Sequence, residues 1–195
     1  MSDKVQWENF LSPKILRSNL IIASIYITAF EVLKTAIVGR IRDFYLVDFD
    51  VFRGQIGPKY QTEVLARNRS PVYASLEWLK ESRVINDGDM TTFEEVKKLR
   101  NHLAHSLTQV LSEGPPSDLP SRFHEMISLL DKIERWWIIN VDIATDSNFA
   151  GKEVDPEKVV PGPVMALQLM IQIALGSDDW QIEELIKQIQ TSRAN

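Results

Sequence analysis

The sequence contains no cysteine, which excludes disulfide bonds and thiolate metal sites. It also lacks a Walker phosphate loop, a Gly-x-Gly-x-x-Gly motif, the serine elbow of hydrolases and a helix-turn-helix pattern for reading DNA. The motifs of the common nucleotide-binding, hydrolase and DNA-binding classes are therefore missing. We expect a protein that works without a cofactor.

Long apolar runs are also scarce. The longest, Leu20–Leu33, is interrupted by Ser24, Thr28 and Glu31 and is shorter than the roughly 20 residues of a membrane span. We interpret this stretch as a buried core helix. The first residues, Met1–Lys4, are not followed by the apolar region of a secretory signal. We therefore expect a cytoplasmic protein that does not contact a membrane.

The charge balance is only mildly acidic. Of the 195 residues, 44% are hydrophobic and 25% are charged, as in an ordinary globular domain. The net charge of −5 argues against a general affinity for nucleic acid. Any RNA binding would have to be concentrated in a local cleft, one that two subunits could build together.

Convincing strand patterns are absent, and the chain is predicted to be all-α. Serine followed by proline, at positions 12–13 and 70–71, is a typical helix start. The cluster Asn86–Asp89 predicts a turn, and Thr91 and Thr92, each three residues before a glutamate, predict the start of the next helix. A loop is expected over residues 48–59. The predicted helices cover residues 13–45, 60–66, 71–84, 91–111, 119–144, 164–175 and 178–192.

Proline and glycine also divide the chain into units. Residues 147–163 contain three prolines and two glycines with little periodicity, which predicts a linker. Residues 1–146 then form a helical bundle, and residues 164–195 form a C-terminal helical pair. Trp180 lies on the apolar face of the last helix. We expect this pair to pack on the bundle or on a dimer partner.

Two of the three histidines lie in the hexapeptide Arg-Asn-His-Leu-Ala-His at positions 100–105. On a helix, Asn101 and His105 lie one above the other, and Arg100 lies next to them. Along the helix axis about 7–8 Å separates the backbones of Arg100 and His105, roughly the space that a phosphodiester needs. This face lies away from the apolar stripe formed by Val96, Leu99, Leu103, Leu107 and Val110.

These residue types suit phosphodiester cleavage. A guanidinium is always charged and binds two phosphate oxygens at once, as Arg100 could. An imidazole such as that of His105 titrates near neutrality and transfers protons. The amide of Asn101 can orient the imidazole or bind a phosphate oxygen. RNA supplies its own nucleophile, the 2′-hydroxyl, so no metal is needed. On spacing alone, however, an arginine and a histidine on one helix are more often a solvated face.

The segment Leu99–His105 resembles the signature of HEPN domains (higher eukaryotes and prokaryotes nucleotide-binding). In that superfamily an arginine, usually followed by a polar residue, precedes a histidine by four to six residues. The order of predicted helices over Leu11–Ala144 is also similar to the HEPN bundle of two helical hairpins. The C-terminal helical pair is not part of the resemblance.

The resemblance implies a HEPN-like helical bundle with a C-terminal extension and a metal-independent endoribonuclease activity. Family members act as toxins, in defence against phage or in RNA processing, and they commonly form homodimers with a composite cleft. An antitoxin or regulatory protein would be a further partner. By position, Arg100 and His105 are catalytic and Asn101 assists them, with Glu31 and His102 as supporting candidates. Glu31 has an equally plausible role as the ion-pair partner of a nearby arginine.

Other polar residues carry weaker expectations. Several basic residues are candidates for contacts with the RNA backbone: Arg83, Lys97 and Lys98, and also Arg67 and Arg69. Each of them is more simply explained as a charged side chain in solvent. The spacing of His102 and His105 permits a metal on a helix, but no carboxylate pair completes a site, so none is expected. His124 is expected to face solvent. Trp136 and Trp137 resemble a stacking platform, but core packing or a dimer contact is the better interpretation.

The sequence is also compatible with two functions that involve no catalysis. The chain could be a non-catalytic HEPN-like binding module that senses a nucleotide or serves as a toxin–antitoxin or immunity partner. It could also be a dimeric scaffold in which the arginine and histidine form only interface contacts.

Overall fold

The described part of the chain is almost entirely helical. The computed structural model describes residues 7, 10–47, 55–149 and 154–175, and within these ranges the only strand-like pairing is an isolated bridge between Leu46 and Ile56. The all-α prediction is therefore confirmed. The α-helices are α2 (Pro13–Phe44), α3 (Pro71–Glu81), α4 (Asp87–His105), α5 (Leu107–Glu113), α6 (Leu119–Trp137), α7 (Ile143–Thr145) and α8 (Gly162–Leu175). Shorter π and 3-10 segments are η1 (Tyr60–Val64), η2 (Leu65–Arg67), η3 (Ile138–Asp142), η4 (Ser147–Phe149) and η5 (Pro156–Lys158).

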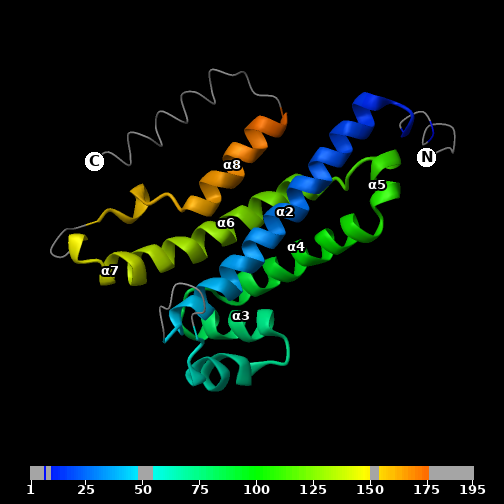
Figure 1. Ribbon diagram of the computed structural model, residues 1–195. Coiled ribbons are helices and arrows are strands. Elements are labelled where there is room, and N and C mark those ends of the chain that lie inside the picture. The colour runs from blue at the N-terminus through cyan, green and yellow to red at the C-terminus, as the bar shows by residue number, and fades with distance from the viewer. Residues whose placement is uncertain (1–6, 8–9, 48–54, 150–153, 176–195) are drawn as a thin grey trace.

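Helix α2 runs through the centre of the bundle (Figure 1) and packs against α3, α4, α5, α6 and α8. Its fully buried side chains include Tyr26, Leu33, Ile37 and Ile41. By length and composition alone, α2 is also apolar enough to cross a membrane. Nine of its residues are buried against the other helices, as a core helix requires, while Ile15, Leu20 and Phe44 are exposed, so the helix is less buried than the sequence predicted.

The start of α4 differs from the prediction. The helix begins at Asp87, because the Asn86 side chain accepts a hydrogen bond from the Asp89 backbone N–H (3.1 Å) and the Asp89 carboxylate accepts one from the Asn86 N–H (2.7 Å). This reciprocal capping box satisfies two N–H groups that the helix leaves unpaired. Thr91 lies inside the helix, where its hydroxyl donates to the Asp87 carbonyl. The predicted turn at Asn86–Asp89 and the predicted caps at Thr91 and Thr92 are wrong.

The corrected cap makes a testable prediction. Asn86→Ala should lower the free energy of unfolding by about 1 kcal/mol, because it removes the acceptor that pairs with the Asp89 N–H. Thr92→Ala, at the position that the sequence pattern favoured, should cause no loss, since alanine suits a helix interior better than threonine. Urea unfolding of the two variants measures both changes. Equal destabilisation by both would contradict this cap.

Two helices end earlier than predicted. Helix α3 ends at Glu81 rather than near Val84, because Arg83 adopts a positive φ of 59° and the Val84 N–H bonds back to the Leu79 carbonyl. Helix α4 ends at His105, where the prediction continued to residue 111. Ser106 leaves helical geometry there, and α5 turns so that it packs against α2.

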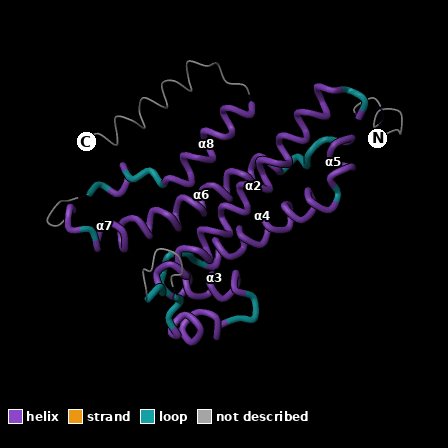
Figure 2. The backbone as a smooth tube through the Cα atoms, in the orientation of Figure 1, coloured by secondary structure: helices purple, strands orange, loops and turns teal. Residues whose placement is uncertain are grey.

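The C-terminal half of the bundle follows the predicted helices more closely. Helix α6 continues through η3 into α7, close to the predicted range 119–144 (Figure 2). Helix α8 covers the predicted range 164–175 and packs against α2 and α6, with Val164 and Leu167 buried in the core. The short helix predicted at 60–66 is present as η1 and η2. The predicted helix at 178–192, with Trp180, lies outside the described residues.

Candidate functional site

Arg100 projects from α4 toward α2 and is held there by several contacts. Its Nη2 donates to Glu31 Oε1 at 2.8 Å, and its Nη1 donates to the neighbouring Asn101 Oδ1 at 3.2 Å. The guanidinium carbon lies 5.6 Å from the centroid of the Phe30 ring, a cation–π distance. Its Nε is buried and has no hydrogen-bond partner among the described residues. The guanidinium is thus fixed in position while part of its donor capacity is unused.

Glu31 joins two cations with one carboxylate. Oε1 accepts from Arg100, and Oε2 accepts from Lys34, one turn further along α2. The hydrogen bond from Lys34 holds the pKa of the Glu31 carboxyl below its usual value; burial acts in the opposite direction, and Arg100 adds to the lowering. The structure shows the ion-pair role considered for Glu31, and the arginine that it pairs with is the candidate catalytic one. Lys34 was not identified from the sequence.

The two histidines of the hexapeptide are exposed in the last turn of α4. His105 is the final residue of the helix, and no hydrogen bond to its imidazole is found within the described ranges. Asn101 is half-buried and lies one turn before His105 on the same face. The structure thus joins Arg100, Asn101 and Glu31 by direct contacts, and it places His105 at an accessible position next to them along the helix.

Two segments of the helices that carry these residues are rich in positive charge. Residues 13–42 contain five lysines and arginines, and Glu31 is their only carboxylate. Residues 96–112 contain three lysines and arginines and no carboxylate. Because these segments belong to α2, α4 and α5, which pack together, the acidic chain has a region where positive charge dominates.

The remaining candidates are dispersed. The Lys97 ammonium donates to the Tyr73 hydroxyl and lies 4.6 Å from the centroid of that ring, whereas Lys98 is exposed on α4. Arg83 is exposed beyond the end of α3, and His124 is exposed on α6. Within the described ranges, no three His, Asp or Glu side chains are grouped so that they could hold a metal ion.

The tryptophan pair divides between core and surface. Trp137 is buried, and its ring lies parallel to that of Trp78, with 5.9 Å between the ring centroids. Trp136 is half-buried and meets Trp137 edge-on. Core packing of Trp137 is therefore confirmed, and the pair does not form one flat platform for bases.

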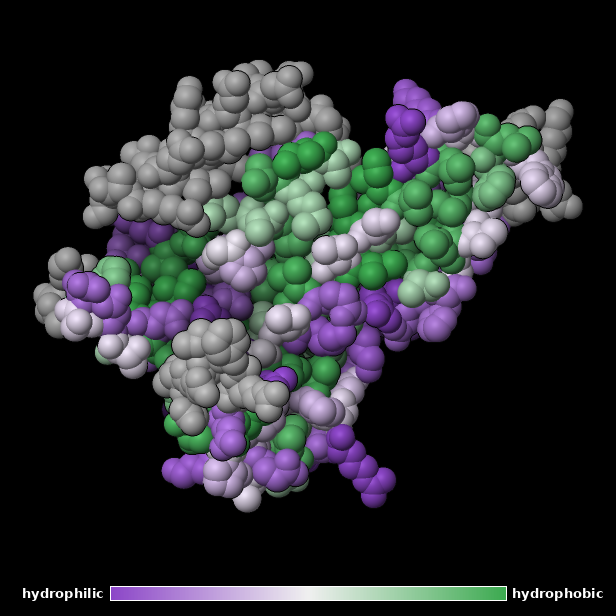
Figure 3. Space-filling model, in the orientation of Figure 1, coloured by the Kyte–Doolittle hydropathy of each residue, from purple (hydrophilic) through white to green (hydrophobic). Residues whose placement is uncertain are grey.

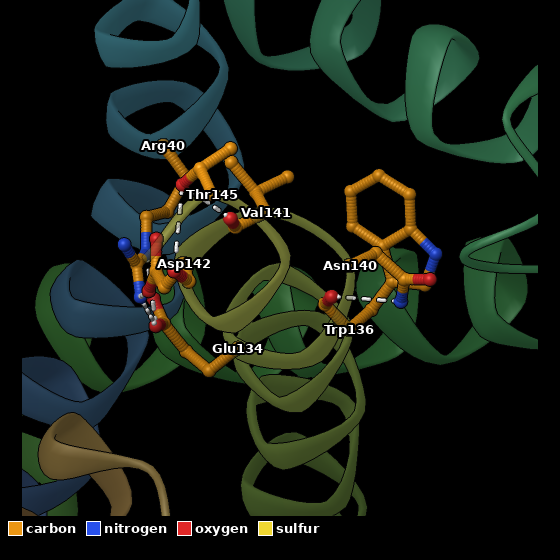
Figure 4. Close-up of polar contacts among 7 residues, drawn as sticks. All are labelled: Arg40, Glu134, Trp136, Asn140, Val141, Asp142 and Thr145. Atoms are coloured by element: carbon orange, nitrogen blue, oxygen red, sulfur yellow. Dashed lines mark hydrogen bonds and ion pairs between the residues drawn. The ribbon is translucent and has the colours of Figure 1, made fainter. Parts of the chain in front are cut away.

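A second charged cluster was missed from the sequence (Figure 4). The carboxylate of Glu134 on α6 is almost completely buried, and its Oε2 accepts from Arg40 Nη2 at 2.9 Å and from Arg40 Nε at 3.1 Å. The same Nη2 lies 3.1 Å from Asp142 Oδ2 of η3. Burial alone would lower the pKa of Arg40, but the two carboxylates raise it above its usual value. One sequence signal could have revealed this cluster: Glu134 is an acidic residue among the apolar residues Ile133 and Trp137 of α6.

A hollow of about 360 Å³ along α2 connects the two clusters. Its lining includes Glu31, Thr35, Gly39, Arg40 and Glu134. Figure 3 shows that apolar side chains gather on the visible face over α8 and over the N-terminal half of α2. The exposed large apolar residues of these two helices include Ile15 and Leu20 of α2 and Met170 and Ile173 of α8.

The site therefore consists of a fixed arginine, its amide and carboxylate partners, a lysine that shares the carboxylate and an accessible histidine. These groups can bind an anion and transfer a proton. Comparisons of this chain with protein-family models, with curated proteins and with solved structures find no match.

Proposed function

We propose that this protein is a metal-independent endoribonuclease of HEPN type, acting as a toxin or as an effector of phage defence. The observation that carries the proposal is the contact chain from Glu31 through Arg100 to Asn101, with His105 accessible one turn further along α4. The contacts hold the guanidinium over Phe30 and engage one N–H on each Nη, which leaves a second N–H on each. Such pre-positioned charge is what a phosphoryl transition state requires.

In the proposed reaction the RNA 2′-oxygen attacks the adjacent phosphorus. The bond from the 2′-oxygen to phosphorus forms, and the bond from phosphorus to the 5′-oxygen breaks. His105 accepts the proton of the 2′-hydroxyl, and the 5′-oxygen takes up a proton from water as it leaves. Arg100 binds the phosphate oxygens, on which negative charge accumulates, and Asn101 orients Arg100. The products are a 2′,3′-cyclic phosphate and a 5′-hydroxyl.

The proposal extends to the assembly of the protein. We place it in the cytoplasm as a homodimer whose two motif helices share one cleft, under the control of an antitoxin or regulatory protein. The apolar side chains that gather over α8 and the N-terminal half of α2 support a partner surface, since contiguous apolar patches on a protein commonly mark interaction sites.

The alternative is a non-catalytic HEPN-like module that captures a nucleotide or a protein partner. The observation that favours it is the pairing of Arg100 with Glu31, which neutralises the guanidinium in this structure. In that case the same site would bind an anion without chemistry.

Incubation of the purified protein with total cellular RNA and a tRNA pool, in EDTA, tests the proposal. We expect cuts with cyclic-phosphate and 5′-hydroxyl ends, because no step requires a metal. An Arg100→Ala protein purified in parallel should give no cuts above background, which excludes a contaminating nuclease. Cuts with 5′-phosphate ends, or no cuts by the wild-type protein, would refute the nuclease and favour the binding module.

A further inference from the structure

We propose that Lys34 is a second backbone-phosphate contact of this site, acting beside Arg100 on the same RNA strand. The inference rests on the proposed function for the identity of the ligand, RNA. The first observation is that one Glu31 carboxylate binds both cations, Arg100 through Oε1 and Lys34 through Oε2. The ammonium and the guanidinium therefore lie on either side of a single anion and carry one more positive charge than it can balance.

Other carboxylates are absent from the stretches of α2, α4 and α5 that surround this pair of cations. Glu31 is the only acidic residue among residues 13–42, and residues 96–112 contain none. Glu134 lines the same hollow as Glu31 but is paired with Arg40, so Glu31 is the carboxylate that pairs with Arg100 and Lys34. Arg40, further along α2, is already paired with Glu134 and Asp142 and does not compete for this role.

Both cations are accessible and have unused donors. Arg100, Lys34 and Glu31 have side chains that are 30%, 40% and 40% exposed. An ammonium has three donors, and Glu31 takes one from Lys34. Arg100 donates once from Nη1 and once from Nη2, which leaves a second N–H on each of these nitrogens, while its Nε is buried. A phosphate can thus bind without either cation first leaving α2 or α4.

The two cations differ in the chemistry that they offer. A guanidinium presents a planar fork that suits the reacting phosphate, while an ammonium acts as a point charge on a flexible stem. We therefore assign Lys34 to binding of the strand rather than to the bond-breaking step. Glu31 is then a positioning residue that keeps the two cations together until RNA binds.

Salt-dependent binding tests this assignment. Dissociation constants of a fluorescein-labelled single-stranded RNA are measured between low and moderate salt in the His105→Ala background, in which cleavage should be slow. Each phosphate contact contributes about 0.7 to the slope of log K against log salt for a single strand. We expect Lys34→Gln to reduce the slope by about 0.7, and in the active protein to raise KM while kcat changes little.

Lys158→Gln is the matched control, because Lys158 also pairs with a carboxylate three residues earlier, Asp155, but lies on η5. It should leave the slope and KM unchanged. Glu31→Gln, which removes the shared anion, should tighten binding. An unchanged slope and KM in Lys34→Gln, with wild-type cleavage intact, would overturn the role of Lys34 alone. No salt-dependent RNA binding by any of these proteins would overturn this inference together with the proposed function.

Discussion

Replacing His105 with alanine is expected to slow RNA cleavage by about 10²–10⁴-fold, the usual contribution of a positioned general acid or base. The loss should appear in the cleavage step, because His105 is the residue that accepts the 2′-hydroxyl proton in the proposed reaction. His105 is exposed at the end of α4, so its removal should not disturb the packed core. A single-turnover rate on labelled RNA measures the effect, and an unchanged thermal midpoint confirms that the fold is intact.

The matched control for this variant is His124→Ala, which removes another exposed histidine, from α6. It should cut at the wild-type rate. If His105→Ala cut RNA as fast as this control, the imidazole would have no part in the mechanism, even if Arg100→Ala were inactive. The experiment therefore separates a site that uses proton transfer from one that uses charge alone.

The positions of most helices could be predicted because they depend on local signals. Serine followed by proline marks the start of α2 and of α3, and the glycine at 114 marks the end of α5. The errors arose where two local signals competed. Thr91 and Thr92 fit the same capping pattern as Asn86, and only the contact between Asn86 and Asp89 decides where α4 begins.

The break after α4 has a different cause. Continuous periodicity predicted one helix to residue 111, but α5 turns at Ser106 so that Val110 is buried and Asn19 donates to the Leu111 carbonyl at 3.1 Å. Asn19 lies 92 residues away in sequence. A contact at that separation leaves no mark on the periodicity of either helix, so tertiary packing overrode the local prediction.

The candidate site could be predicted only in part for the same reason. Helical geometry places Arg100 next to Asn101, and the structure shows their contact. The bond from Arg100 to Glu31 spans 69 residues, and it became a candidate only because an acid stands out inside an apolar helix. Lys34 gave no such signal, since a lysine on a helix surface is ordinary.

Arg40→Met is expected to destabilise the protein by about 3 kcal/mol, because it leaves the carboxylate of Glu134 buried without its partner. The estimate is the lower end of the usual range, since Arg40 is 31% exposed and water can reach the site. For a chain of this length the loss corresponds to a fall of roughly 6–12 °C in the thermal midpoint. Guanidinium unfolding and a thermal scan measure the two quantities.

The double variant Arg40→Met/Glu134→Met distinguishes an unpaired charge from a loss of packing. When both charges are removed, no carboxylate is left buried alone, so most of the stability should return. Arg42→Met, two residues further along α2 and exposed, should change stability by less than about 0.5 kcal/mol. If Arg40→Met resembled Arg42→Met, the cluster would be a surface pair of little energetic weight. If the double variant were no more stable than Arg40→Met, the arginine side chain would act through its packing between α2, α6 and η3, and not through its charge.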